Sequence, residues 1–249
     1  MVDPHVHTLA SIHAYSTVNE CIQAALEKGL RGIVITDHAK RPAAAIDGDF
    51  GYYDHFQHFF NLKVIPPYVN GIRVFRGAEV DILDLGGTLV FPNRIIELFQ
   101  LEVVIASVHP DVPIGKPWET KSQHTEAYIR VLENPLVDIL GHSGTPEFSY
   151  DIDKVLLTAK RLDKMIEVNN STFTVRPQSL ENCKKIALRC KELGVYITIG
   201  SDAHVCYDVG RFDAALKMLR EIDFPEALIA NASLERFIGI LNKRKNIAI

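Results

Sequence analysis

Short, almost continuously apolar runs recur along the chain and alternate with amphipathic segments. No polar residue interrupts Gly32-Ile33-Val34-Ile35 or Val103-Val104-Ile105-Ala106. Uninterrupted hydrophobicity is typical of strands that are covered on both faces, as in a parallel sheet. The pattern predicts seven strands, near residues 2–7, 31–37, 72–80, 102–108, 136–142, 165–171 and 195–201.

The segments between these runs carry the signals of helices. Thr17 and Glu20 have the spacing of a capping box, and Gly29 marks the end of the same helix. From Ser179 to Leu193, apolar residues recur at three- and four-residue intervals. Repeated strand–helix units predict an α/β fold with parallel strands, either as an open doubly wound sheet or as a closed barrel.

The chain has no repeat of fixed period, no low-complexity stretch and no linker, which predicts a single domain over residues 1–249. Stretches 40–53 and 110–119 contain proline and glycine and are interpreted as loops. We expect no domain boundary at either of them.

The composition is ordinary for a globular protein, with 47% hydrophobic and 23% charged residues and a formal net charge of -4. Nonspecific binding to nucleic acid or to an anionic membrane depends on excess positive charge, so neither partner is expected. No apolar run approaches the roughly 20 residues of a membrane span, and the N-terminus lacks the pattern of a signal peptide. We therefore expect a cytoplasmic protein.

Side chains that bind metals stand at the C-terminal ends of successive predicted strands. They are His5 and His7, His38, Glu79, His109, His142, and finally Asp202 with His204. A single histidine at a strand end is more often a hydrogen-bonded structural residue. Independent coincidences would not select the same end of each strand, and in a (β/α) barrel those ends converge on one mouth. The set therefore favours the barrel and predicts a metal centre.

The spacing of these residues supports the same interpretation. His5 and His7 are two apart on a strand, so both imidazoles point to the same side, and Asp202 and His204 repeat that spacing. Imidazole and carboxylate together suit zinc, manganese or iron. The four cysteines form no C-x-x-C pair, which argues against a closed structural zinc site.

Four further histidines have weaker signals. His13 lies in the loop after the first strand and, taken alone, would be a solvated loop residue. His55 and His58 share a face of a predicted helix and could reach toward the mouth, but a surface helix is favoured. His124 is expected near a helix start, with no role in the site.

Seven short motifs contain these ligands or follow a strand: Asp3-Pro4-His5-Val6-His7-Thr8, Thr36-Asp37-His38, Gly77-Ala78-Glu79, Ser107-Val108-His109, Gly141-His142-Ser143-Gly144, Glu167-Val168-Asn169-Asn170-Ser171 and Gly200-Ser201-Asp202-Ala203-His204. Together they resemble the polymerase and histidinol phosphatase (PHP) superfamily along nearly the whole chain. The segment His13-Ala14-Tyr15-Ser16 is most similar to small stand-alone bacterial members with a trinuclear zinc centre. The resemblance implies a distorted seven-stranded (β/α)7, TIM-like barrel, in agreement with the strand count.

The resemblance also implies three divalent ions, zinc first, with manganese and iron as alternatives. It assigns His5, His7, Glu79 and Asp202 to one ion, Glu79 as a bridge with His109 and His142 to a second, and His13, His38 and His204 to a third. The implied activity is hydrolysis of small phosphomonoesters by in-line attack of a metal-bound hydroxide on phosphorus. Three ions, two carboxylates and one hydroxide would leave a charge of roughly +3, which attracts a phosphate.

Two residues are candidates for catalytic roles beside the ions. Arg176 could clamp a phosphate oxygen through its planar guanidinium, and family members use a basic residue near this position. Asp37 could hydrogen-bond a ligand imidazole. The structural alternatives are a surface arginine and a turn carboxylate.

Three other functions remain open. A histidinol-phosphate phosphatase needs the same centre and differs only in the surrounding pocket, which the 40–53 loop could shape. A metal-dependent amidohydrolase also begins with a His-x-His strand, but it usually has a longer chain and often a bridging modified lysine, a role that Glu79 takes here. The third is a metal-dependent scaffold or a nuclease-like accessory module of a polymerase.

Overall fold

The computed structural model describes residues 1–39, 50–109, 114 and 119–245. Most of the predicted 40–53 and 110–119 loops lie outside these residues. The helix α2 (Phe50–Asn61) begins inside the first of the two predicted loops. Within the described part of the chain, no helix is both long and apolar enough to cross a bilayer.

The seven predicted strands form one parallel sheet. In sheet order they are β1 (Val2–Val6), β2 (Gly32–Ile35), β4 (Ile72–Asp81), β5 (Val103–Ser107), β6 (Ile139–Leu140), β7 (Met165–Asn169) and β8 (Ile197–Gly200). An eighth strand, β3 (Tyr68–Val69), was not expected and pairs antiparallel with the start of β4. The two strands are joined by Asn70-Gly71, both with positive φ, which is the geometry of a tight hairpin turn.

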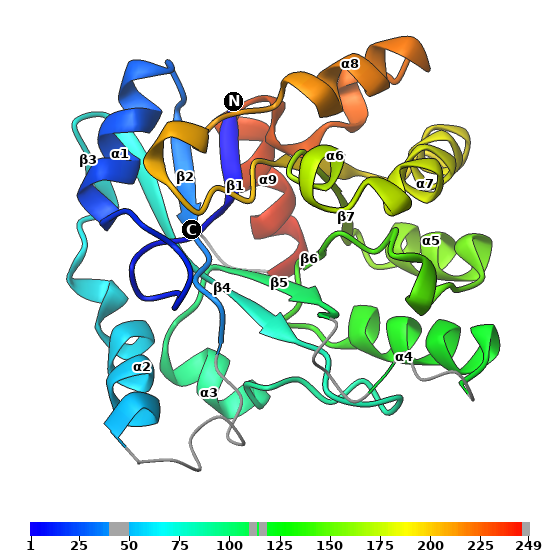
Figure 1. The fold of residues 1–249 in the computed structure, drawn as a ribbon, viewed down its shortest axis with the longest axis horizontal. Helices are drawn as coiled ribbons and strands as arrows, with labels where there is room; N and C mark the ends of the chain where they lie inside the picture. Colours follow the sequence, from blue (N-terminus) through cyan, green and yellow to red (C-terminus); the bar gives the residue numbers. More distant parts are fainter. Residues whose placement is uncertain (40–49, 110–113, 115–118, 246–249) are drawn as a thin grey trace.

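The sheet closes into a nearly complete barrel where β1 meets the segment after β8 (Figure 1). Val6 pairs with Ala203 in a parallel bridge. The His7 amide donates to the Ala203 carbonyl at 2.9 Å, and the Asp202 amide donates to the His5 carbonyl at 3.0 Å. The closed barrel is therefore confirmed and the open doubly wound sheet is excluded. Closure also brings the first and last predicted ligand pairs side by side.

The helices cover the outside of the strands and one end of the barrel. They are α1 (Val18–Glu27), α2, α3 (Asn93–Leu98), α4 (Lys121–Glu133), α5 (Ile152–Arg161), α6 (Thr172–Val175), α7 (Leu180–Leu193), α8 (Asp213–Glu221) and α9 (Leu234–Lys245). The capping box of Thr17 and Glu20 is confirmed at the start of α1. Short 3-10 helices occupy Leu62–Val64, Pro146–Phe148, Pro177–Ser179, Cys206–Asp208, Glu226–Leu228 and Ala230–Ala232.

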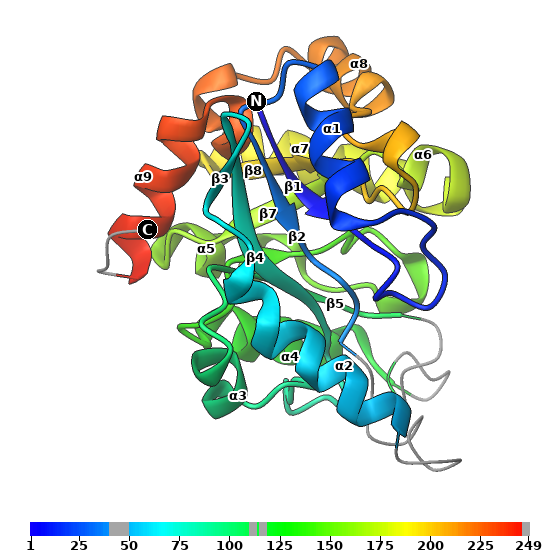
Figure 2. The same cartoon turned by 90° about the vertical axis from the view of Figure 1, so that its left-hand side faces the viewer.

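The last helix, α9, covers the N-terminal end of the barrel. Side chains alternate along β2: Ile33 and Ile35 pack outward against helices, whereas Val34 points to the inner cluster. That inner cluster is completed by α9, and Phe237 meets Phe75 edge to face with ring centroids 5.5 Å apart. Figure 2 shows α9 on the opposite side of the strands from the loop that follows β1. Apolar packing thus fills one end of the barrel and leaves the other end to polar side chains.

Buried charges also attach α9 to the barrel. The fully buried carboxylate of Asp138, just before β6, contacts the guanidinium of Arg244 and lies 3.0 Å from the ammonium of Lys245. It also accepts a hydrogen bond from the Val104 amide at 2.8 Å. Buried charges are tolerable only when paired in this way.

Candidate metal centre

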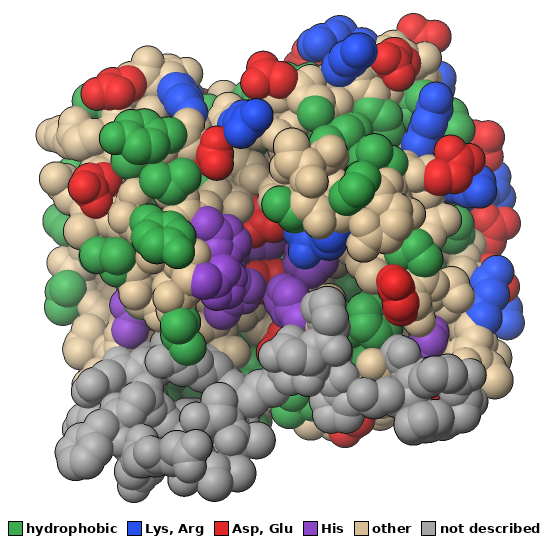
Figure 3. Space-filling model, viewed as in Figure 1, with side chains coloured by type: hydrophobic (Ala, Val, Ile, Leu, Met, Phe, Trp, Pro, Cys, Tyr) green, Lys and Arg blue, Asp and Glu red, His purple; other side chains and the backbone are tan. Residues whose placement is uncertain are grey.

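All nine predicted ligand side chains meet at the C-terminal mouth of the barrel. Figure 3 shows histidines gathered around a hollow with acidic side chains at its base, and hydrophobic side chains beside it. The nine are His5, His7, His13, His38, Glu79, His109, His142, Asp202 and His204, linked by the contacts described below. Eight of them were expected here from their positions at strand ends, whereas His13 was expected only from the resemblance.

Glu79, near the end of β4, is the centre of the cluster. Its Oε2 lies 2.9 Å from His38 Nδ1, 3.4 Å from His5 Nε2 and 3.5 Å from His7 Nε2, and its Oε1 lies 2.9 Å from His142 Nε2 and 3.4 Å from His109 Nε2. Burial alone would raise the pKa of Glu79, but the neighbouring histidines, His38 foremost, hold it well below its usual value. The side chain is therefore an ionised carboxylate surrounded by imidazoles.

Asp202, just after β8, uses its two oxygens differently. Its Oδ1 lies 3.2 Å from His7 Nε2 and 3.6 Å from His5 Nε2. Its Oδ2 accepts hydrogen bonds from Asn169 Nδ2 at 3.1 Å and from Arg176 Nη2 at 2.9 Å. One oxygen is thus fixed by donors while the other faces the imidazoles.

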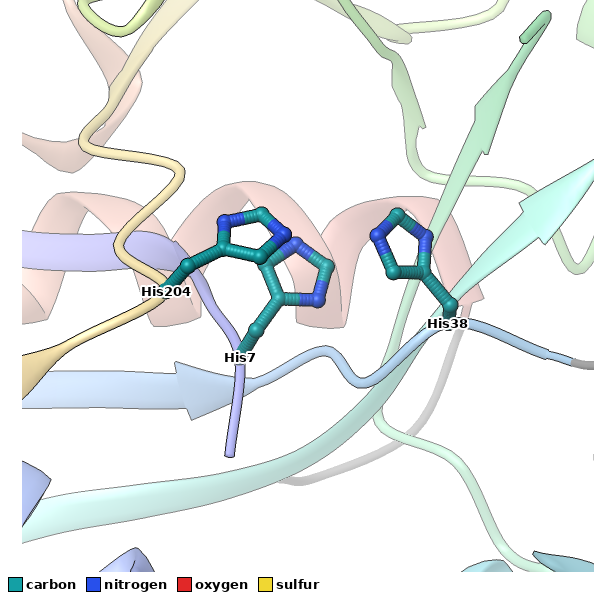
Figure 4. Close-up of side chains that lie close together, drawn as sticks. All are labelled: His7, His38 and His204. Atoms are coloured by element: carbon teal, nitrogen blue, oxygen red, sulfur yellow. The ribbon is translucent and has the colours of Figure 1, made fainter. Parts of the chain in front are cut away.

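Histidines from three segments stack at the outer part of the mouth (Figure 4). The ring of His7 stacks on His204 and on His38, with centroids 4.2 Å and 4.3 Å apart. His13 joins them from the loop after β1, with its Nε2 3.0 Å from His204 Nε2. Burial, together with the neighbouring histidines, lowers the pKa of His13. Burial likewise lowers the pKa of His7 to about 3, so the His7 ring is neutral at neutral pH.

The residues present fit divalent metal ions. His5 Nε2, His7 Nε2, His38 Nε2 and Glu79 Oε2 are all buried and have no hydrogen-bond partner. Burying such atoms is costly unless something else binds them, so each one is an available ligand atom. Nitrogen and oxygen ligands without thiolate suit zinc, manganese and iron.

Among the described residues, three groups have ligand atoms within 4.8 Å of one another: His7, His38 and His204; His5, His7 and Asp202; and His38, Glu79 and His109. The second group contains three of the four residues in the first set implied by the resemblance and lacks Glu79. In the other two, His7 stands where His13 was expected and His38 stands where His142 was expected. His13 and His142 each adjoin a member of the group, His204 and Glu79 respectively.

Two carboxylates that the sequence analysis left without a role orient ligand imidazoles. Glu167 Oε1 lies 2.6 Å from His5 Nδ1, and Asp81 Oδ1 lies 2.6 Å from His109 Nδ1. Each carboxylate accepts a hydrogen bond from the Nδ1–H of its histidine, so that Nε2 faces the centre. This arrangement is common around protein-bound metals. Asp81 follows Glu79 by two residues on the same strand, so strand periodicity was a usable signal.

The contact between Glu167 and His5 depends on a glycine. A Cβ added to Gly200 would lie 2.3 Å from Glu167 Oε1 and 2.9 Å from His5 Cβ. A methyl group at this position in β8 would therefore displace the carboxylate from the imidazole. A steric clash with any larger residue therefore explains the glycine at the start of the Gly200-Ser201-Asp202 motif.

Asp37 does not occupy the position that was expected for it. In the described contacts its carboxylate accepts from the Thr8 amide at 2.6 Å and from Ser11 Oγ at 2.7 Å, and it reaches His7 only through Ser11. His58 Nε2 of α2 lies 2.8 Å from Asp37 Oδ2. Burial alone would raise the pKa of Asp37, but His58 foremost holds it below its usual value.

The surface interpretation of His58 is therefore wrong, because α2 turns this side chain inward. The side chain of His55 lies outside the described residues. His124 is in the first turn of α4, as expected, where it is buried and contacts Glu119 and the Ser149 carbonyl rather than the centre.

Backbone strain coincides with two of the ligand positions. His142 and Asp202 have φ values of 22° and 57°, in the left-handed region that residues with a Cβ rarely adopt. Such conformations cost about 1–3 kcal/mol each and persist where the surroundings determine them. Each residue is the second after a strand, β6 ending at Leu140 and β8 ending at Gly200, where a sharp turn aims the side chain into the mouth.

Comparisons with known proteins find similar sequences and similar folds. The model of the PHP domain matches residues 3–178. A probable phosphatase from Acetivibrio thermocellus is 43% identical over 245 residues, which cover 98% of this chain and 96% of the relative. A probable phosphatase from Caldicellulosiruptor bescii is 44% identical over 240 residues, covering 96% and 95%.

Two solved structures share the fold. A histidinol phosphate phosphatase from Lactococcus lactis, complexed with zinc, L-histidinol and phosphate, has a TM-score of 0.62 at 20% identity and covers 90% of this chain and 94% of its own. A probable 2-pyrone-4,6-dicarboxylic acid hydrolase from Acinetobacter baumannii has a TM-score of 0.51 at 15% identity, covering 97% and 98%. At these identities the likeness extends to the fold alone.

Proposed function

Because this chain belongs to the PHP domain family, we propose that it is a metal-dependent phosphatase that hydrolyses phosphomonoesters of small molecules. The observation that carries the proposal is the cluster of buried, unpartnered ligand atoms around Glu79. Relatives named probable phosphatases, similar over nearly their whole length, support the reaction class.

The proposed centre holds three divalent ions, zinc first, with manganese and iron as alternatives. His5, His7, Glu79 and Asp202 would hold one ion, Glu79, His109 and His142 a second, and His13, His38 and His204 the third. When bound, such ions supply a nucleophile from water and offset the charge of the phosphate.

The other polar groups at the mouth would bind the phosphate or orient the proposed metal ligands. Arg176 Nη2 contacts Asp202, while Arg176 Nε is buried and lacks a partner. The guanidinium can therefore hold Asp202 in place and still offer donors to a phosphate oxygen. Glu167 and Asp81 keep His5 and His109 turned toward the centre.

Metal removal tests the proposed function. After complete removal of metal by a chelator, hydrolysis of p-nitrophenyl phosphate should fall by at least about 10³-fold, because both the nucleophile and the charge compensation are lost. Zinc or manganese should restore the activity in proportion to the ions rebound. Turnover that survives complete metal removal would refute the proposal.

We expect Arg176→Ala to lower kcat/KM by about 10–100-fold, the usual range for a hydrogen bond to a charged group. Arg176→Lys should recover only part of the loss, because the lysine keeps the charge but not the planar fork. Steady-state kinetics and metal analysis should be run together. If the metal content falls in both variants, Arg176 serves Asp202 and not the phosphate.

A substrate panel separates the close alternatives. A preference for histidinol phosphate over other phosphomonoesters would identify the narrower activity. The barrel shared with a 2-pyrone-4,6-dicarboxylic acid hydrolase leaves hydrolysis of amides or lactones as a distant alternative, which turnover of those substrates without phosphatase activity would support. No turnover with metal fully loaded would favour a non-enzymatic role.

A further inference from the structure

We infer that Ser11 fixes the tautomer of His7, so that this ring presents an unprotonated Nε2 to the centre. Ser11 would then be a positioning residue, which acts through His7 rather than on the substrate. Its value for metal binding rests on the proposed function. The tautomer itself is a property of the metal-free chain and is tested separately.

Ser11 lies in the loop after β1, where its side chain is buried. Three groups surround its hydroxyl oxygen: Asp37 Oδ1 at 2.7 Å, the His38 amide nitrogen at 3.0 Å and His7 Nδ1 at 3.2 Å. A serine hydroxyl has one proton to donate and two lone pairs that accept. Three partners therefore use its full capacity.

In two of the three contacts, the donor of the hydrogen bond is fixed. The His38 amide can only donate, so it occupies one lone pair of Ser11 Oγ. Asp37 Oδ1 already accepts from the Thr8 amide at 2.6 Å and acts as a carboxylate oxygen. Two oxygens 2.7 Å apart need a proton between them, and Ser11 supplies it.

The remaining contact is then determined. With its only proton given to Asp37, Ser11 Oγ can meet His7 Nδ1 only as an acceptor, so Nδ1 carries the proton. A neutral imidazole has one N–H, which leaves Nε2 of His7 with a free lone pair. That lone pair faces Asp202 Oδ1 at 3.2 Å and Glu79 Oε2 at 3.5 Å, which is a place for a cation.

Without Ser11 the opposite tautomer would be favoured in the metal-free chain. A proton on Nε2 would donate to the nearby oxygen of Asp202, and that hydrogen bond would compete with metal binding. In two other candidate ligands a carboxylate accepts the hydrogen bond from Nδ1–H: Glu167 for His5 and Asp81 for His109. For His7 the acceptor is the hydroxyl of Ser11, and Asp37 orients that hydroxyl.

The direct test is the protonation pattern of His7 in the metal-free wild-type protein. Long-range ¹H–¹⁵N NMR at pH 7.5 distinguishes the two neutral tautomers, and a His7→Gln variant assigns the signals. We expect the proton on Nδ1. A wild-type spectrum with the proton on Nε2 would overturn the inference without any variant of Ser11.

Variants of Ser11 test its causal role. Ser11→Ala should move His7 toward the Nε2–H tautomer and weaken binding of one zinc ion by about 10–100-fold in competition with a chelator. Ser11→Thr, which keeps the hydroxyl, should restore both. Ser16→Ala is the matched control, since it removes a buried hydroxyl that holds the Cys206 amide instead of an imidazole, and should leave the His7 tautomer unchanged.

These outcomes separate the two proposals. Ser11→Ala with the proton still on Nδ1 would refute the role of Ser11, whatever the activity. A wild-type chain with the expected tautomer that binds no zinc, manganese or iron would refute the proposed function and leave the inference intact.

Discussion

Replacing Glu79 by glutamine is expected to lower kcat/KM by roughly 10³-fold or more and to remove most of the bound metal. The glutamine keeps the shape of the side chain but not its charge, and five imidazoles lie within 3.5 Å of this one carboxylate. Loss of an outer partner of a metal ligand already costs about 10–100-fold, so loss of the proposed bridging ligand is expected to cost more. Phosphatase kinetics and metal analysis of the purified variant measure both effects.

The exposed carboxylate of Glu147 gives a control for this variant. Glu147→Gln removes the same charge outside the cluster, and both metal content and kcat/KM should stay at the wild-type level. A Glu79→Gln protein that retained full metal and full activity would contradict the central position of this residue.

The second large effect concerns stability. We expect Phe237→Ala to lower the free energy of unfolding by about 3–5 kcal/mol, the usual cost of deleting a buried phenylalanine side chain. Phe237 is fully buried between α9 and the strands, so the deletion opens a cavity at the N-terminal end of the barrel. Urea unfolding followed by circular dichroism measures the change.

Lys243→Ala provides the comparison on the same helix. Its side chain is 71% exposed and its ammonium lies 2.7 Å from Asp163, and exposed pairs of this kind contribute about 0–1 kcal/mol. The urea concentration at the midpoint of unfolding should therefore hardly change. Equal losses in the two variants would show that α9 contributes through its surface rather than through the barrel interior.

Much of the barrel could be predicted because parallel strands buried on both faces have continuous apolar runs. Val103–Ser107 in β5 is an example of a run that maps onto a strand with little change. Apolar runs overestimate the length of a strand where its pairing is short: the stretch at 136–142 forms only Ile139–Leu140 as β6. They do not predict β3, although Asn70-Gly71 is a hairpin signal, because two paired residues are too few to show a period.

The convergence of the candidate ligands could be predicted because strand ends in a barrel share one mouth, so position along the chain maps onto position in space. Apart from Asp81, the groups around these ligands do not follow that rule. Ser11, Glu167 and His58 reach their partners through packing between elements that are distant in the sequence. Their spacing from the ligands shows no period. The sequence placed Glu167 in a motif and allowed His58 to reach the mouth, but it did not indicate the contacts that they make.

The bridge between β1 and the residues after β8 has a consequence for the order in which the molecule assembles. His5 and Asp202 become neighbours only when the two ends of the sheet meet, a contact of very high sequence separation. Contacts of this kind form late and slow the folding reaction. Ions bound as proposed between His5 and Asp202 are therefore expected to accelerate refolding little but to slow unfolding, because they would join the two ends of the sheet.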